Sequence, residues 1–325
     1  MKFPQLPLQV QWSIAAIFGL LVLATIVVRV LAAVRPQANW TELRQRINSW
    51  WLMAVVFTTA MILSRRISLA FFAFVSFMAL KEFFSLIPTR RADRRVLFWA
   101  YLAIPAQYYL VYIEWYGTFI IFIPVYMFLL LPFRMVLVGE TDGYLRAAGT
   151  LHWGLMVTVF SISHAAFLLI LQLKDRPDEV VGPGLVLMLV VLTQLNDVCQ
   201  FLWGKSLGRR KILPAVSPGK TWAGFVGGVA TTTVIARFAG PLLTPLDATQ
   251  SLIAGLIIGI AGFIGDVNIS ALKRDLQVKD SGSLLPGHGG ILDRIDSLTY
   301  TAPLFFHYVY WLFDWQTFGA GAVGL

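Results

Sequence analysis

Long apolar stretches separated by short polar segments run through most of the chain. Most of these stretches approach the ~20 residues that a helix needs to cross a bilayer. Backbone polar groups inside lipid need partners within the same segment, which favours helices. Alternating segments of ~10 residues, which would favour a transmembrane barrel, are not found. The pattern therefore predicts an all-α, polytopic integral membrane helical bundle with about nine or ten transmembrane helices.

The predicted spans lie at 12–34, 50–64, 67–87, 97–114, 117–135, 151–173, 183–203, 222–242, 248–265 and 300–313. The second and third are short, so a re-entrant pair is the alternative to two complete crossings. The first run is too long for a signal-peptide core and no small-residue cleavage site follows it, so we expect a retained span. Between the first two spans, "RPQANWTELRQRINSWW" suggests an interfacial helix because tryptophans suit the headgroup layer, and a connecting loop is the alternative.

Composition supports the membrane assignment, since 58% of the residues are hydrophobic and only 13% are charged. A net charge of +9 could suggest a nucleic-acid partner in a soluble protein. In a membrane protein, basic loops on one side of the bilayer explain it better, so we predict no nucleic-acid partner and contact with anionic membrane lipids. The single cysteine, Cys199, lies within an apolar run and cannot form an intrachain disulfide.

The loop charges predict which side of the membrane each loop faces. If 204–221 is cytoplasmic and the spans alternate, the cytoplasmic side collects Arg35, Arg44, Arg46, the basic run at 90–95, Lys205, Arg209, Arg210, Lys211, Lys220, Lys273, Arg274, Lys279 and Arg294. The opposite side keeps only Lys2, Arg65, Arg66, Lys174 and Arg176. This asymmetry places the N-terminus outside, and the two charged segments 204–221 and 266–299 together in the cytoplasm.

A stripe of small and polar residues marks the span that enters the second charged segment. The residues on it are spaced three or four apart: Gly255, Gly259, Gly262, Asp266, Ser270 and Lys273. Such spacing places them on one helix face, and glycines let a second helix approach closely. We therefore expect Asp266 to face the bundle interior with a partner or a cation, the alternative being a structural ion pair with Lys273 or Arg274.

Two carboxylates, Asp293 and Asp296, share one helix face in "LDRIDS". They repel each other unless a cation lies between them. Oxygen ligands without cysteine favour Mg²⁺ over zinc. A solvated charged turn is the alternative reading.

Two further segments predict phosphate binding. "PGHGG" surrounds His288 with glycines, among them Gly289 and Gly290, whose backbone N–H groups could cradle a phosphate. "SPGKT" ends in Gly-Lys-Thr but is not a P-loop, because position 214 is a proline where the pattern needs glycine and no strand is expected before it. Ser217, Lys220 and Thr221 are nevertheless predicted at the start of a membrane helix, where anions are favoured.

Asp197 lies with Asn196 near the inner end of an otherwise apolar span. An ionisable residue there suggests function, and a helix-to-helix hydrogen bond is the alternative. His152, His164 and His307 stand alone in apolar surroundings and receive no role.

The segment "SALKRDLQVKDSGSLLPGHGGILDRID" at 270–296 resembles the signature of the phosphatidate cytidylyltransferases, or CDP-diacylglycerol synthases. The fixed positions of that signature are Ser270, Lys273, Arg274, Lys279, Asp280, Pro286, His288, Gly289, Gly290, Asp293, Arg294 and Asp296. "SPGKTW" and Gly265-Asp266 also resemble the family, whereas Ala223 stands where the family usually has glutamate. The likeness covers about 190–300, and the N-terminal half matches only as membrane spans.

The resemblance implies transfer of CMP from CTP to phosphatidate, with Mg²⁺ as cofactor and a second metal ion left open. It implies metal binding by Asp266, Asp293 and Asp296, with Asp197 as a further candidate. The implied catalytic residues are Lys273, Arg274, Lys279, Asp280, His288 and Arg294. The implied phosphate-binding residues are Ser217, Lys220, Thr221, Ser270, Gly289 and Gly290.

The expected organisation is one compact unit, with N-terminal helices in 1–175 and catalytic helices in 176–325. We expect it in a bacterial inner membrane with a cytoplasm-facing site, and leave a homodimer open. A CTP-dependent lipid kinase and a cytidylyltransferase for another lipid phosphate are the enzymatic alternatives. A transporter or scaffold is less compatible, because transporters bind near the bilayer midplane and here the polar groups gather at one end of the spans.

Overall fold

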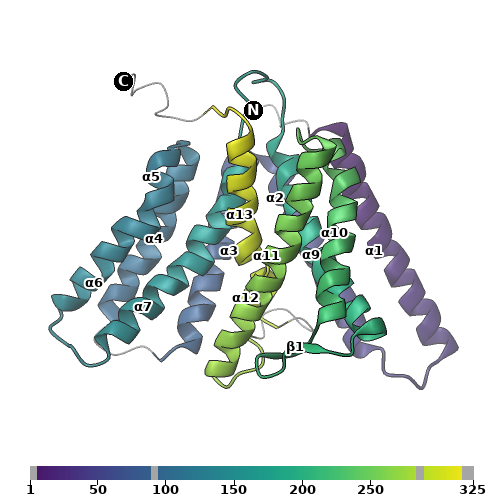
Figure 1. The fold of residues 1–325 in the computed structure, drawn as a ribbon, viewed down its shortest axis with the longest axis horizontal. Coiled ribbons are helices and arrows are strands. Elements are labelled where there is room, and N and C mark those ends of the chain that lie inside the picture. The colour runs from purple at the N-terminus through teal and green to yellow at the C-terminus, as the bar shows by residue number, and fades with distance from the viewer. Residues whose placement is uncertain (1–5, 89–93, 283–288, 317–325) are drawn as a thin grey trace.

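Long helices lying side by side build the whole molecule (Figure 1). The computed structural model describes residues 6–88, 94–282 and 289–316. The unbroken long helices are α1 (Leu8–Val34), α2 (Thr41–Leu63), α3 (Arg65–Leu86), α4 (Arg94–Tyr112), α9 (Gly182–Leu207), α10 (Trp222–Leu243), α11 (Ala248–Asp275) and α13 (Leu298–Leu312). Two more rods are each built from three segments: α5 (Tyr116–Ile121), η2 (Phe122–Met127) and α6 (Phe128–Val136), then α7 (Tyr144–Leu155), η3 (Met156–Phe160) and α8 (Ser161–Ile170).

This architecture confirms the prediction of an all-α polytopic membrane protein. Among the described residues, eight helical stretches are long and apolar enough to cross a bilayer. Both α2, with 23 residues, and α3, with 22, are long enough to cross, so the re-entrant alternative is not supported. The expected interfacial helix is wrong as a separate element. Its polar residues from Thr41 onward form the first turns of α2 and continue directly into the apolar part.

The two segmented rods contain π-helical turns whose causes lie in the sequence. Pro124 falls within η2, where its missing N–H and its ring disturb the helical hydrogen bonds. In η3 the Thr158 hydroxyl donates to the Gly154 carbonyl at 2.7 Å, and such back-bonding weakens the regular ladder. These wide turns lie in the N-terminal half and contact each other.

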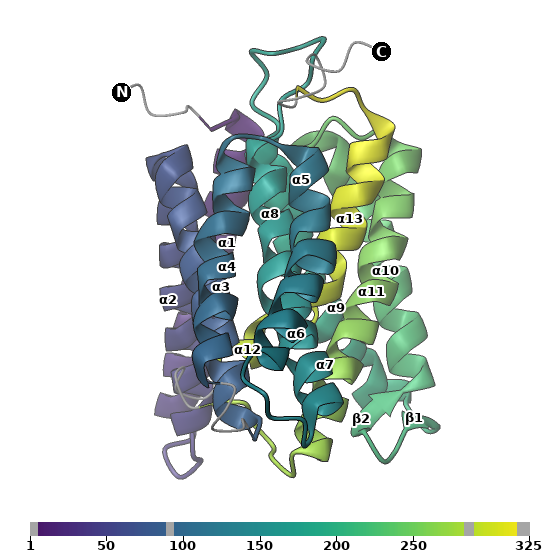
Figure 2. The ribbon, with the colours of Figure 1, turned by 90° about the vertical axis from the view of Figure 1, so that its left-hand side faces the viewer.

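Both the start of α1 and the end of α13 lie at one end of the bundle, and the opposite end carries a small β-hairpin (Figures 1 and 2). Its strands are β1 (Lys211–Leu213) and β2 (Ser217–Thr221), paired antiparallel with Lys211 opposite Thr221. We did not expect this hairpin. The expectation of a plain helix start at "SPGKT" is corrected, because strand pairing orders that segment before α10 begins at Trp222.

The glycine stripe on α11 packs as predicted. A Cβ at Gly255 would overlap with Ala236 of α10, and one at Gly259 would lie 3.2 Å from the Val229 Cα. Farther along, a Cβ at Gly262 would lie 3.0 Å from the Asn196 amide of α9. Close approach of α9, α10 and α11 therefore turns the polar end of the stripe toward the bundle interior.

Candidate functional site

The hairpin delivers one lysine into the end of the bundle. Lys220, in β2, places its Nζ 2.5 Å from Asp266 Oδ2 on α11 and 2.9 Å from Gln200 Oε1 on α9. Its neighbour Thr221 caps α10, because the Thr221 hydroxyl accepts the Gly224 N–H at 3.1 Å. The cap fixes where β2 ends, and so it fixes the backbone from which Lys220 extends.

Three carboxylates surround this ammonium group. Asp197 Oδ1 lies 4.0 Å from Lys220 Nζ, and Ser297 connects Asp197 to Asp296. The Ser297 hydroxyl donates to Asp197 Oδ2 at 2.9 Å, while the Ser297 N–H donates to Asp296 Oδ1 at 2.7 Å. We call Asp197, Asp266 and Asp296 the carboxylate trio. It joins α9, α11 and the turn that leads into α13.

The trio and its lysine perturb each other's protonation. Burial, together with repulsion from Asp266 and Asp197, raises the pKa of Asp296 well above its ordinary value. Burial alone would lower the pKa of Lys220, but attraction to Asp266 and Asp197 outweighs it and raises that pKa. Lys220 is therefore a cation at neutral pH, while Asp296 takes up a proton more readily than an ordinary aspartate.

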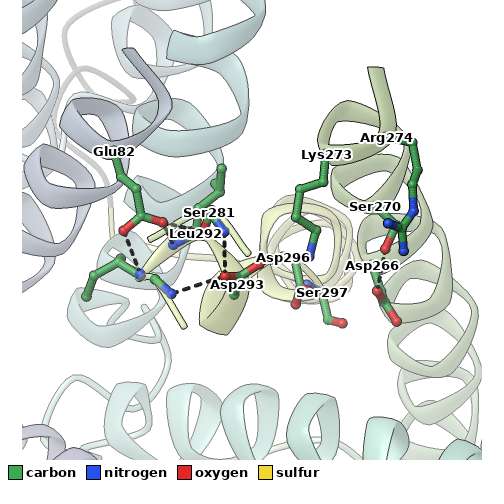
Figure 3. A network of polar contacts seen from close by, with 12 residues as sticks. Glu82, Asp266, Ser270, Lys273, Arg274, Ser281, Leu292, Asp293, Asp296 and Ser297 are labelled. Carbon is green, nitrogen blue, oxygen red and sulfur yellow. Dashed lines mark hydrogen bonds and ion pairs between the residues drawn. The ribbon is translucent and has the colours of Figure 1, made fainter. Parts of the chain in front are cut away.

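Asp293 occupies a different environment from the trio (Figure 3). Its Oδ1 accepts from Lys273 Nζ at 2.8 Å, and its Oδ2 accepts the backbone N–H groups of Ser281 and Gly290 at 2.8 and 3.1 Å. Burial opposes the charge, but Lys273 and these two amides outweigh it and lower the pKa of Asp293. Asp293 is therefore already held by three donors, one of them charged.

Glu82 of α3 holds the same loop from the other side (Figure 3). Its carboxylate accepts the N–H groups of Ile291 at 2.9 Å and Leu292 at 3.0 Å, and also the hydroxyl of Ser281. Sequence reasoning missed Glu82, which lies in the half of the chain that matches the family only as spans. The available signal was an acidic residue inside an apolar stretch, the same signal that singled out Asp197.

The other predicted residues lie around the carboxylate trio and around Asp293. The Ser270 hydroxyl donates to Asp266 at 3.2 Å, and Arg274 Nε donates to the Val216 carbonyl at 3.1 Å, which ties α11 to the hairpin. Gly289 has a φ of +79°, and a Cβ there would lie 2.6 Å from Asp293 Oδ2. The remaining predicted positions are Ser217 at the start of β2, the exposed Lys279 and Asp280, Arg294 in the short helix α12 (Leu292–Ile295), and His288, which lies outside the described residues.

The trio fits a divalent cation in charge and chemistry. Three carboxylates face one ammonium group, and the buried Asp197 Oδ1 has no hydrogen-bond partner among the described residues. Oxygen donors of this kind suit Mg²⁺. Within the described part of the chain, no three acidic, histidine or cysteine side chains already stand in a metal-binding arrangement. Lys220 Nζ lies 2.5 Å from Asp266 and 4.0 Å from Asp197, so a metal ion bound by both would compete with its ammonium group.

Comparison with known proteins places this geometry in context. A model described as "Cytidylyltransferase family" matches residues 44–312. The Escherichia coli (strain K12) "Uncharacterized protein YnbB" is 48% identical over 297 residues, covering 91% of this chain and 97% of that protein. The phosphatidate cytidylyltransferase of Bacillus subtilis (strain 168) is 42% identical over 125 residues, and that of Haemophilus influenzae is 40% identical over 134 residues. These two matches cover 35% and 40% of this chain, and each spans 46% of the enzyme it matches.

Proposed function

This chain belongs to the cytidylyltransferase family, and we propose that it transfers CMP from CTP to phosphatidate, giving CDP-diacylglycerol and pyrophosphate. Family membership supports a multi-pass membrane nucleotidyltransferase. The observation that carries the finer proposal is the carboxylate trio around Lys220 at one end of the bundle. A site at a helix end can meet a water-soluble nucleotide and a lipid phosphate together, which a site at the bilayer midplane could not do as easily.

The proposed reaction needs no strong base. The lipid phosphate is already an anion at neutral pH, and one of its oxygens attacks the α-phosphorus of CTP. The bond from that phosphorus to the β-phosphate oxygen breaks, and its electrons leave with pyrophosphate. The difficulty is bringing two anions together and stabilising negative charge on the leaving group.

Basic residues near the carboxylate trio and near Asp293 would supply much of that stabilisation. Lys220 is a cation held by carboxylates, and incoming phosphates could compete for it. Lys273 is paired with Asp293, so its position is fixed before substrate arrives. Arg294 has a buried Nε without a hydrogen-bond partner among the described residues, which leaves that donor available to a phosphate.

We propose Mg²⁺ as the cofactor, held by Asp197, Asp266 and Asp296. When bound, it would neutralise charge on the triphosphate and the departing pyrophosphate. In that arrangement Lys220 would leave the trio for a phosphate, while Asp293 would keep Lys273 and the loop amides in place. This ligand set differs from the one that the family resemblance implies: we leave Asp293 out because its carboxylate already accepts from Lys273 and two backbone amides.

We further propose that the hairpin end faces the cytoplasm of a bacterial cell, across its inner membrane. The predicted cytoplasmic loops carry most of the basic residues, as the positive-inside rule requires. CTP is a cytoplasmic nucleotide, so this orientation gives the trio access to its substrate.

Product analysis tests the proposal. Purified protein in lipid nanodiscs is incubated with Mg²⁺, phosphatidate and CTP labelled either in the cytidine or at the γ-phosphate. We expect cytidine label in the lipid fraction and γ-label in pyrophosphate, with both lost in Asp266→Asn. Transfer of γ-label to lipid with release of CDP would identify a kinase instead.

A different acceptor is the second candidate. The YnbB match covers nearly the whole chain, whereas the matches to phosphatidate cytidylyltransferases cover under half of it. A panel of lipid phosphates in the same assay separates the two. Cytidine label on another lipid phosphate, with none on phosphatidate, would keep the chemistry and change the substrate. No incorporation with any acceptor would favour a scaffold.

A further inference from the structure

One carboxylate of the N-terminal half contacts both described flanks of the loop between α11 and α12. Glu82 lies near the end of α3, about 200 residues before its partners Ser281, Ile291 and Leu292. Two of those partners are consecutive backbone amides at the start of α12, and the third is a side chain on the preceding loop. A single side chain therefore joins both described flanks of this loop to a helix outside the catalytic half.

The packing around Glu82 is tight at the two described flanks of the loop. A Cβ at Gly290 would overlap with both carboxylate oxygens of Glu82, and a Cβ at Gly282 would lie 3.0 Å from Oε2. The backbone at both glycines thus lies directly against the carboxylate. All three donors point at the two carboxylate oxygens of Glu82, so one side chain accepts from both described flanks of the loop.

The residue held next to these contacts is Asp293. Leu292 donates to Glu82, and the following residue uses its carboxylate to hold Lys273 on α11. Ser281 has a double role, since its hydroxyl donates to Glu82 and its N–H donates to Asp293 Oδ2. Any shift of the loop away from α3 would therefore loosen the ion pair that fixes Lys273.

We propose that Glu82 is a positioning residue for the reaction, which holds the start of α12 and the Ser281 backbone so that Asp293 and Lys273 keep their places. This inference rests on the proposed cytidylyl transfer for its activity readout. It gives the N-terminal helices a part in the chemistry beyond membrane anchoring, because α3 supplies the fixed point for the loop.

The test compares three variants in nanodiscs. Glu82→Gln keeps the size of the side chain but presents N–H groups to donors, and Glu82→Asp keeps the charge but withdraws it by about 1.5 Å. Glu114→Gln is the matched control, since Glu114 is ion-paired to Arg65 at the other end of α3. Amide hydrogen exchange is followed in the peptide 289–295 and in peptides from α10, alongside thermal melting and turnover.

We expect Glu82→Gln to speed exchange in 289–295 by about 10- to 100-fold, the range expected for losing one charge-assisted hydrogen bond. Exchange in α10 and the melting temperature should change little. Turnover of Glu82→Gln should fall at least about tenfold. Glu82→Asp should show a smaller rise in exchange and a smaller loss of turnover than Glu82→Gln. Glu114→Gln should match the wild type in turnover and in the 289–295 peptide.

Unchanged exchange in 289–295 with Glu82→Gln would overturn the inference, as would an equal rise in exchange across all helices, which marks general destabilisation. Faster exchange with full turnover would also overturn it, because the loop position would then not matter to the reaction. A wild type without any cytidylyl transfer refutes the proposed function separately. In that case the exchange data still decide whether Glu82 holds the loop.

Discussion

Replacing Lys220 with methionine tests the electrostatic account of the site most directly. Methionine keeps most of the length of the side chain but removes the only ammonium group that contacts the carboxylate trio among the described residues. The Lys220 side chain is 18% exposed and that of Asp266 is 21% exposed, so water screens the pair only in part. Removing one partner of a buried pair costs about 3–5 kcal/mol, and the partial exposure favours the lower figure.

The stability lost in Lys220→Met should increase as the pH rises. Asp296 already has a raised pKa in the folded protein, and removing Lys220 leaves more uncompensated negative charge beside it. Between the ordinary carboxyl pKa near 4 and the raised value, the folded protein binds more protons than the unfolded chain. The free energy of unfolding therefore falls as the pH rises through this window. The Lys220→Met defect should be small at pH 5 and largest at pH 8.

Thermal melting in detergent measures this prediction, with Lys205→Met as the matched control. Lys205 is exposed on the same end of the bundle, its Nζ lies 5.9 Å from the centre of the Phe201 ring, and it has no carboxylate partner among the described residues. At pH 8 without metal, Lys220→Met should melt several degrees below the wild type. Adding Mg²⁺ should raise the melting temperature of the variant by more than that of the wild type, because the ammonium group no longer competes for the trio. Equal melting of Lys220→Met and Lys205→Met at both pH values, with no extra effect of Mg²⁺, would refute the reasoning.

Three further predictions concern the loop, its packing and the orientation of the chain. Asp293→Asn should lower the free energy of unfolding by about 2–4 kcal/mol at pH 7, because Lys273 loses its charged partner. The lowered pKa of Asp293 means that its carboxylate stabilises the fold only while it is ionised, so the difference from the wild type should shrink as the pH falls below 4. Melting curves across this pH range measure the effect. Gly290→Ala should abolish turnover in the wild type yet cost far less when combined with Glu82→Ala, which removes the overlapping carboxylate, and additive losses would contradict the packing described above. In a chain without its native cysteine, a cysteine at Ser206 should resist an impermeant thiol reagent in intact cells, and labelling from outside would reverse the proposed orientation.

Sequence reasoning predicted the parts of the fold that depend on local pattern. The apolar stretches gave the helices to within a few residues at many of their ends, and the three- and four-residue spacing on α11 correctly turned Asp266 inward. Both follow from helical geometry alone. The hairpin at 211–221 was missed because its strands are too short to show an alternating pattern, and pairing with each other stabilises them.

Predicting the partners of each carboxylate was harder. The sequence places Asp293 and Asp296 on one helix face, yet their partners on α11 differ. Asp293 pairs with Lys273, whereas Asp296 lies near Asp266, which is about two helical turns before Lys273. Which of them joins the trio depends on the angle at which the chain enters α13, and no spacing rule contains that angle. Glu82 was missed for a similar reason, since its partners are about 200 residues away in the chain.

The glycine stripe of α11 also limits how this helix can change in evolution. Gly255, Gly259 and Gly262 fix the rotation of the helix against α9 and α10, and Asp266 follows on the same face. Deleting or inserting one residue between Gly259 and Asp266 would turn the carboxylate by about 100° and move it by about 1.5 Å along the axis. The glycines before the change would hold the first part of the helix in place, so Asp266 and the residues after it would turn away from Lys220 together. Length variation among descendants of this chain should therefore collect in the connecting loops and spare this stretch of α11.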